Sequence, residues 1–375
     1  MSHTIVPPVL KRAAQLLLYM VLFLAILCVG AVLALPWLVS RPASMAALLQ
    51  EIEARTGHRI SIEQSHIEIF PSPRLALMQP RLYDSASSKP RVIAERVEIA
   101  LQWLPLLEGR LVAKDLVIDR PQVTIRRWPN GNWSLGKDDS PADSSDSTRP
   151  FALFQVVRNL FVIHGVVTLV DESASTPIPL HITVTQGALA SDMMGRRAML
   201  HLSGEIPQAR GQAAFLYEGS LTQTDEGGGI QAEGDLRVHR LHVRDALAYW
   251  LGDGRISDGF AQPAQLTAHL RWVPRVGGAD LLADDVRAEL ADVSLQGSLA
   301  ILGIGTPQAR FSSTMSAPPV AVTRLLSELP SAWISDQLRA QFTDHAVEGV
   351  ITLQTLSITG ELKPGARPRV NGLVA

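Results

Sequence analysis

Residues 96–133, RVEIALQWLPLLEGRLVAKDLVIDRPQVTIRRWPNGNW, decide the fold of this chain. Apolar side chains recur two residues apart at Val97 and Ile99, and again within 116–118 and 123–125, with polar or small residues mostly between them. Successive side chains of a strand point to opposite faces of a sheet, so this period predicts strands with one apolar face. The Asn-Gly pair near the end of the stretch then marks a turn.

The same period continues on both sides of this stretch. Upstream it involves Ile60 and Ile62, Ile67 and Ile69, and Leu75 and Leu77. Downstream, further strands are predicted around 166–169, 180–184, 198–202, 213–221, 230–238, 266–273, 286–299, 309–315 and 350–358. The sequence therefore predicts a mainly β protein with a few short helices inserted.

Composition divides the chain after residue 40 into a β-rich module, a linker and a second β-rich region. Residues 42–135 begin with an amphipathic helix at about 42–56 and continue as strands. Residues 136–150, GKDDSPADSSDSTRP, contain no large apolar side chain and predict a linker or mobile loop. Residues 151–375 then return to strands, and the apolar segment at their start, 151–161, fits either a helix or a strand.

Two segments of the second region share one pattern. Residues 234–254 and 313–333 each run from a strand into a short helix with one apolar face, and then reach a residue that ends the helix. Such a repeat predicts an elongated sheet in which each unit contacts mostly its neighbours. The sequence closes with PGARPRVNGLVA, inside what the pattern predicts as another strand, so we expect either an open sheet edge or an N-terminal piece of a longer protein.

An uncharged run at residues 13–35 predicts a membrane anchor. As a helix this run would rise about 34 Å, which is enough to cross the core of a bilayer. A cleaved signal peptide would have a shorter apolar region followed by small residues, whereas this run leads into Pro36. Lys11 and Arg12 precede the run, and positive residues stay on the cytoplasmic side. We therefore expect residues 1–12 in the cytoplasm, one span, and the rest of the chain on the other side.

Composition argues against several classes of function. Hydrophobic residues make up 46% of the chain and charged residues 19%, so the chain has enough apolar surface to fold. Lys and Arg total 34 against 36 Asp and Glu, which leaves no broad basic surface for a nucleic acid. Cys28 is the single cysteine, so one chain holds neither a disulfide framework nor a cysteine-based zinc site.

No pattern in the sequence predicts catalysis, a metal site or a cofactor site. His239 and His242 lie three apart and would point to opposite faces of a strand, so we interpret them as structural or surface residues. The acidic residues of the linker lack the spacing, central glycine and closing glutamate of a calcium loop. They are Asp138, Asp139, Asp143 and Asp146. The HExxH, GxSxG and glycine-rich phosphate-binding motifs are absent, so we predict that the protein is not an enzyme.

Residues 41–135 resemble the N-terminal region of the AsmA family, whose relatives include bridge-like proteins that connect two membranes. The likeness is carried by Pro-Ser-Pro before a strand in FPSPRLALMQPRL, residues 70–82, and by the Leu-Pro-Leu-Leu-x-Gly turn. Pro-x-Val before Asn-Gly-Asn-Trp follows in the family's order. Residues 150–375 are similar to the family only in style, as strands and helices in alternation.

The resemblance implies a single-pass protein of a bacterial inner membrane, with its N-terminus in the cytoplasm and its bulk in the periplasm. Its elongated antiparallel sheet would curve into a groove with an apolar inner face, where it would bind membrane lipid, phospholipid first, and assist lipid transfer or outer-membrane homeostasis. The alternative is a non-enzymatic scaffold or regulator of outer-membrane protein assembly. The sequence names no lipid-contacting residue beyond the expectation that positions such as Ile99 and Leu353 point inward.

Overall fold

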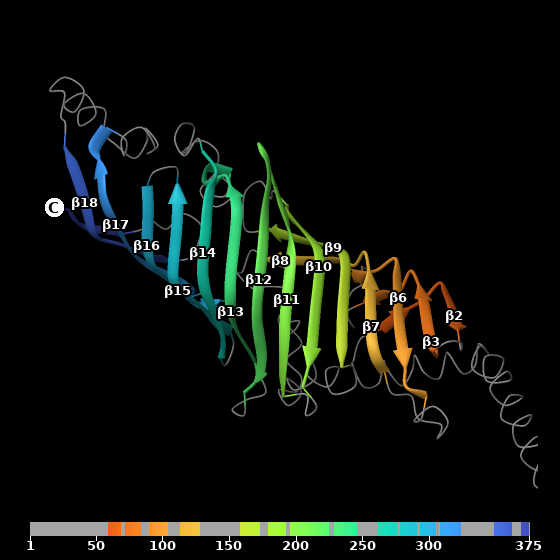
Figure 1. Cartoon of the computed structure of the whole chain (residues 1–375). Helices are drawn as coiled ribbons and strands as arrows, with labels where there is room; N and C mark the ends of the chain where they lie inside the picture. The colour runs from red at the N-terminus through yellow and green to blue at the C-terminus, as the bar shows by residue number, and fades with distance from the viewer. Residues whose placement is uncertain are drawn as a thin grey trace, which may run out of the picture.

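The computed structural model shows a mainly β protein whose strands form one large curved sheet (Figure 1). Nineteen strands belong to this sheet in the part of the chain that the structure describes. Helical residues in the same part are few, at 103, 243–245 and 322–323. The described residues are 59–68, 72–83, 90–103, 113–127, 158–172, 179–192, 196–224, 229–245, 262–275, 278–290, 293–304, 306, 308–323, 349–361 and 369–374.

Eight short strands come first along the chain and form two branches of the sheet. One branch has the order β2–β3–β6–β7 and the other has the order β1–β4–β5–β8, with antiparallel neighbours in both. The strands are β1 (Arg59–Ser61), β2 (Gln64–Glu68), β3 (Arg74–Met78), β4 (Arg81–Tyr83), β5 (Pro90–Ile93), β6 (Arg96–Leu101), β7 (Ala113–Asp119) and β8 (Gln122–Arg127).

Strand β9 (Asn159–Asp171) joins both branches to the rest of the sheet. Its first half pairs in parallel with β7 and its second half pairs in parallel with β8. Its other edge is antiparallel to the next strand along the chain. Parallel neighbours need a long connection, and residues 128–158 supply it here. The strands on either side of the predicted linker at 136–150 are therefore neighbours in one sheet, whereas the sequence had predicted antiparallel pairing throughout.

From β9 onward each strand forms an antiparallel hairpin with the next, and β9–β18 are 12 or 13 residues long (Figure 1). Long strands of nearly equal length give a regular ribbon in which each strand contacts its two neighbours. After β9 the strands are β10 (Leu180–Ser191), β11 (Arg197–Gln208), β12 (Gly211–Gln223), β13 (Ile230–Leu241), β14 (Ala264–Arg275), β15 (Gly278–Leu290), β16 (Val293–Ile304), β17 (Arg310–Ala321), β18 (Val350–Glu361) and β19 (Arg369–Val374).

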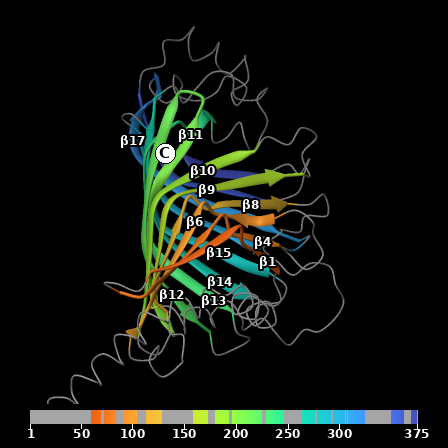
Figure 2. The same cartoon turned by 90° about the vertical axis from the view of Figure 1, so that its right-hand side faces the viewer.

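A bend crosses the N-terminal strands at residues with left-handed backbone angles. Gln79, Arg120 and His164 have φ of 47°, 46° and 53°. They lie between β3 and β4, between β7 and β8, and inside β9. Such a residue inserts a bulge that bends its strand. Backbone pairing continues around the bend, since the Arg120 N–H donates to the Ile163 carbonyl at 2.8 Å. Each strand path therefore runs through both branches, with one part before the bend and one part after it. The sheet is folded about the line of left-handed residues (Figure 2).

The C-terminal strands carry isolated bulges in place of a continuous line. Arg240 in β13 has φ of 58° and Asp285 in β15 has φ of 48°, and the pairing register shifts next to both residues. A bulge increases the local twist of its strand. These strands therefore coil without breaking into separate halves.

Fully buried side chains are few and mostly small in the described part of the sheet. All described strands with extensive mutual contacts are hydrogen-bonded neighbours, so the described strands form a single layer. Large apolar side chains consequently stay half-buried. The one compact cluster consists of Ala268, Ala283 and Val286, with Leu266, Leu270, Leu299 and Met315 packed against it.

Most strands predicted from the sequence are confirmed, including the strand near the end of the sequence. The single strand predicted around 286–299 is wrong, because β15 and β16 form a hairpin with Leu290 opposite Val293. Strands β4 and β5 were not predicted, because three or four residues are too few to display a period.

Several predictions fall on residues outside the described part. They include the span at 13–35, the helix at about 42–56, the Asn-Gly turn and the linker, and the division into domains stays a prediction. Among the residues that are described, no helix has the length and apolar character needed to cross a membrane.

Candidate functional site

Alternation along the strands places apolar side chains in rows that cross the sheet. In each row, every residue lies directly opposite the next one, so all its members project from one face. The first row, from β3 to β11, contains Leu75, Ile99, Leu116, Leu160, Leu189 and Leu200. The second row, from β11 to β17, contains Ala198, Leu221, Ala232, Trp272, Leu281, Ile301 and Phe311. Because Ala198 and Leu200 are two apart in β11, both rows lie on the same surface, which we call the apolar face.

The apolar face of β9–β18 carries no Asp, Glu, Lys or Arg among the described side chains. The charged side chains that the structure describes in these strands project from the opposite surface, the polar face, or lie at the bulges of β13 and β15. An alternating strand in an ordinary half-buried sheet would give the same pattern, but there a second layer would cover the apolar side. Here the described strands leave that side without a covering layer.

The apolar face lies on the inside of the bend. A Cβ atom built on Gly187 would be 3.0 Å from Leu202 Cδ2, 3.3 Å from Val162 Cβ and 3.7 Å from Val184 Cγ1. A Cβ atom on Gly165 would be 3.1 Å from Val162 Cγ1. Side chains that start on both sides of the bend therefore converge over these two glycines. Convergence marks a concave surface, in agreement with the curvature in Figure 2.

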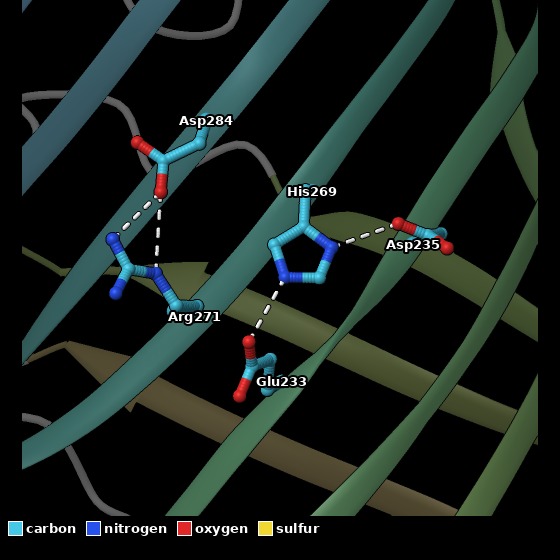
Figure 3. A network of polar contacts seen from close by, with 5 residues as sticks. All are labelled: Glu233, Asp235, His269, Arg271 and Asp284. Carbon is cyan, nitrogen blue, oxygen red and sulfur yellow. Dashed lines mark hydrogen bonds and ion pairs between the residues drawn. The ribbon is translucent and has the colours of Figure 1, made fainter.

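The polar face carries a charged network over β13–β15 (Figure 3). The Nδ1 atom of His269 lies 2.8 Å from an Asp235 carboxylate oxygen, and its Nε2 atom lies 3.2 Å from Glu233. Arg271 donates from Nε and Nη2 to one oxygen of Asp284, at 3.2 and 2.7 Å. The network belongs to a row that crosses β11–β15. This row contains His201, Glu218, Asp235, His269 and Asp284.

The two carboxylates hold His269 toward its charged form. The hydrogen bonds that the ring donates to the carboxylates of Asp235 first and Glu233 second raise the pKa of His269 above its usual value. The imidazole side chain is one-third exposed, so water screens these contacts and each is worth little in stability. No group of His, Cys, Asp and Glu suited to a metal ion occurs among the described residues. The network therefore marks this surface of β13–β15 as the polar face.

Asp280 is the one charged residue that is buried in the described part. Its Oδ1 atom accepts a hydrogen bond from the Gly303 N–H at 2.8 Å, and its Oδ2 atom accepts one from Arg275 Nε. Gly303 has φ of 71°, a backbone conformation that favours glycine. Asp280 therefore ties the hairpin of β14 and β15 to the end of β16, which is a structural role.

The histidines considered from the sequence are not brought together as a site. His239 is exposed opposite Ala214 on the polar face. The His242 N–H donates to the Gln208 side chain at 2.9 Å, just after the end of β13. The four aspartates of the linker lie outside the described residues.

The two positions expected to point inward both lie on the apolar face. Ile99 stands between Leu75 and Leu116 in the first row. Leu353 in β18 is opposite Ala317, two residues from Met315 in β17. The sequence missed the network around His269, because its members become neighbours only through the strand register, which a single strand's pattern does not specify.

Comparison with known protein families finds the AsmA family. Its model matches residues 10–193, which contain all the strands from β1 to β10. This family is not known as enzymatic, and the likeness to it suggests a role associated with the cell envelope. Comparison with curated proteins finds no match.

Proposed function

Because residues 10–193 of this chain carry an AsmA-family domain, we propose that the protein holds lipid acyl chains on its apolar face within the bacterial cell envelope. The observation that carries the proposal is the concave surface of β9–β18, where the described side chains carry no charge and the described strands form no covering layer. The large side chains of this face are half-buried, and a continuous apolar surface without a covering layer of described strands is a candidate binding surface. Acyl chains match it because they need neither a charged partner nor a defined point of attachment.

The energetics of such binding require no specific polar site. Each methylene removed from water contributes about 0.8 kcal/mol, so contact over a run of methylenes adds up to several kcal/mol. The rows of leucine and isoleucine side chains continue across neighbouring strands, which lets a chain shift along the face with little change in contact. This property suits the transfer of phospholipid and, through it, outer-membrane homeostasis.

The proposed placement in the cell follows the sequence. Residues 13–35 would anchor the protein in the inner membrane by one helix, with residues 1–12 in the cytoplasm. The sheet would then stand in the periplasm, where lipid passes between the two membranes. Phospholipid is the lipid class that we expect first, and no cofactor enters the proposal.

A pair of variants on one strand tests the proposal. Leu202 lies on the apolar face of β11, and Met199 lies on the polar face of the same strand with 58% of its surface exposed. The full chain is purified in mild detergent, and native mass spectrometry counts copurifying phospholipid. We expect bound lipid with the wild type and with Met199→Asp, and its loss with Leu202→Asp. Circular dichroism confirms that both variants fold. A folded wild type that carries no lipid and takes up none would contradict the proposal.

A scaffold role is a second candidate, favoured by three apolar residues on the polar face. Phe161 and Ile163 are each 37% exposed, and Met199 is 58% exposed. A protein that assists outer-membrane protein assembly would dock on such residues. In that case Met199→Asp would abolish crosslinking to a protein partner in the envelope, and Leu202→Asp would leave that crosslinking unchanged.

A further inference from the structure

Tyr217 is a large side chain of the apolar face that ends in a hydroxyl. It lies in β12 between Leu202 and Leu236 of the neighbouring strands. Its ring lies across Gly219, since a Cβ atom built on Gly219 would be 2.6 Å from the tyrosine Oη and 2.8 Å from its Cζ. The hydroxyl therefore rests directly above the backbone near the middle of the sheet.

No side chain fits beside this hydroxyl on the neighbouring strand. Gly219 is directly opposite Gly234. A Cβ atom on Gly234 would be only 2.4 Å from the Glu218 carbonyl oxygen and 2.4 Å from Gly219 Cα. The close approach of the two backbones requires glycine at both positions. The Tyr217 hydroxyl thus borders bare backbone and is not enclosed by another side chain there.

The Tyr217 hydroxyl makes no hydrogen bond within the described part of the chain. The side chain is half-buried and its oxygen still reaches water, so the O–H is free to donate to a ligand on this face. Burial and the nearby carboxylates Asp235 and Glu233 raise the pKa of Tyr217 above its usual value. The group therefore remains a neutral O–H donor at the pH of any cell envelope.

Trp272 supplies a second donor of the same kind on the same face. It lies in β14 opposite Ala232, two residues beyond Leu270, which is itself opposite Gly234. Its indole N–H has no acceptor among the described residues. Tyr217 and Trp272 therefore stand on opposite sides of Gly234, as the tyrosine and the tryptophan of β9–β19 in the described part.

We propose that the Tyr217 hydroxyl donates a hydrogen bond to the carbonyl oxygen of an acyl ester whose alkyl chain lies on the apolar face. This rests on the proposed function and names Tyr217 as a positioning residue within it. An ester carbonyl only accepts hydrogen bonds, carries no charge and is attached to the alkyl chain, so it matches an uncharged surface with donors. A phosphate does not match, because the apolar face of β9–β18 offers no cation among the described side chains. Trp272 provides a donor for a second carbonyl.

Competition between two lipids tests the assignment. Dioleoyl phosphatidylcholine has two ester carbonyls, and its dialkyl ether analogue has the same chains and headgroup without them. An equimolar mixture is added to the detergent-purified full chain, and native mass spectrometry reads the ratio of the two bound lipids. Tyr217→Phe removes only the hydroxyl. Tyr83→Phe is the matched control, because Tyr83 lies next to Leu82 on the polar side of β4 and stacks under Arg59.

One neutral hydrogen bond corresponds to a preference of about 2- to 10-fold. We expect the wild type and Tyr83→Phe to favour the diester by at least that factor. Tyr217→Phe should lose this factor and keep only the preference that the Trp272 donor supplies, with its ether binding unchanged. Absence of a preference in the wild type, or a preference in Tyr217→Phe as large as that of the wild type, would overturn the assignment while leaving acyl-chain binding intact. If the wild type binds neither lipid, the proposed function fails, and the assignment fails with it.

Discussion

The strands before β9 and the strands after it build the same concave face in different ways. Before β9, strands of three to seven residues meet end to end at a line of left-handed residues. After β9, single strands of 12 or 13 residues run the full width of the sheet and carry only isolated bulges. The first part is curved by a fold line, and the second is curved by twist and close backbone contact at glycines.

This difference shows that the curvature of the sheet and the apolar character of its concave face have separate causes. The first apolar row passes from β3 through β9 to β11 without a polar member, although it crosses from the folded region into the meander. In both regions apolar and polar side chains alternate along the strands, and the apolar face lies on the concave side of the sheet. We therefore expect changes in curvature to be local, and changes in the apolar face to affect function along the whole sheet.

The largest expected effect concerns the glycines that set the curvature. A Cβ atom on Gly297 would lie 1.9 Å from the Thr314 carbonyl oxygen, whereas a Cβ atom on Gly165 meets only side chains, at 3.1 Å or more. Backbone moves less readily than a side chain, so Gly297→Ala should destabilise β16 and β17 by about 3 kcal/mol and Gly165→Ala should destabilise its strands by about 1 kcal/mol. Hydrogen exchange of the amides in each region measures both. Equal destabilisation by the two substitutions would contradict the proposal that the two regions are curved in different ways.

The next effect concerns the buried carboxylate of the meander. Asp280→Ala leaves the Gly303 N–H and the Arg275 side chain without their acceptor. We expect a loss of about 2 kcal/mol, since an unpaired buried group bears its full desolvation cost. Thermal unfolding followed by circular dichroism measures the loss. Asp280→Asn retains an oxygen for Gly303 and should lose less. A wild-type melting temperature for Asp280→Ala would show that this end of the sheet is held by other contacts.

A smaller effect tests the left-handed residues of both regions. His164 belongs to the fold line, and Arg240 is a bulge of the meander. Alanine at φ near 55° is strained and glycine is not, so glycine should exceed alanine in stability at each position by about 1 kcal/mol. Denaturant unfolding of the four variants gives the two differences. A glycine advantage at His164 alone would mean that the bulge of β13 adapts and that only the fold line is rigid.

The smallest effect is the pH dependence of the polar face. The pKa of His269 is higher in the folded protein than in the unfolded chain. Its contribution to stability is therefore complete below the unfolded value of about 6.5 and is lost as the pH rises through the folded value. His269→Gln should be less stable than the wild type at pH 5.5 by a few tenths of a kcal/mol and equal to it at pH 9. His239→Gln on the same face is the control for the loss of a histidine. A larger loss of stability for His269→Gln at pH 9 than at pH 5.5 would contradict the prediction that the network stabilises the charged imidazole.

The sequence predicted the strands and their apolar sides because a period of two is visible within one strand, as at Val97 and Ile99. It did not predict the fold line, since Arg120 and His164 occupy conformations for which glycine or asparagine is the usual signal. The hairpin after Leu290 was missed because the two residues that follow lack a turn signature.

The candidate site was likewise predicted from the sequence only in part. The inward position of Ile99 follows from alternation alone. The position of the Tyr217 hydroxyl above bare backbone could not be predicted, because it depends on Gly219 lying opposite Gly234, which is a property of strand register. Register depends on how strands pair over long distances, and no local pattern records it.

The most direct test of the central claim is photocrosslinking of the full chain in the envelope. Benzoylphenylalanine is placed at Ile99 in the folded region, at Leu202 and Leu353 in the meander, and at Met199 on the polar face. We predict phospholipid adducts, identified by mass spectrometry, at the three positions of the apolar face and none at Met199. Adducts of equal yield at all four positions, or protein adducts alone at the apolar positions, would contradict the assignment of this face to lipid.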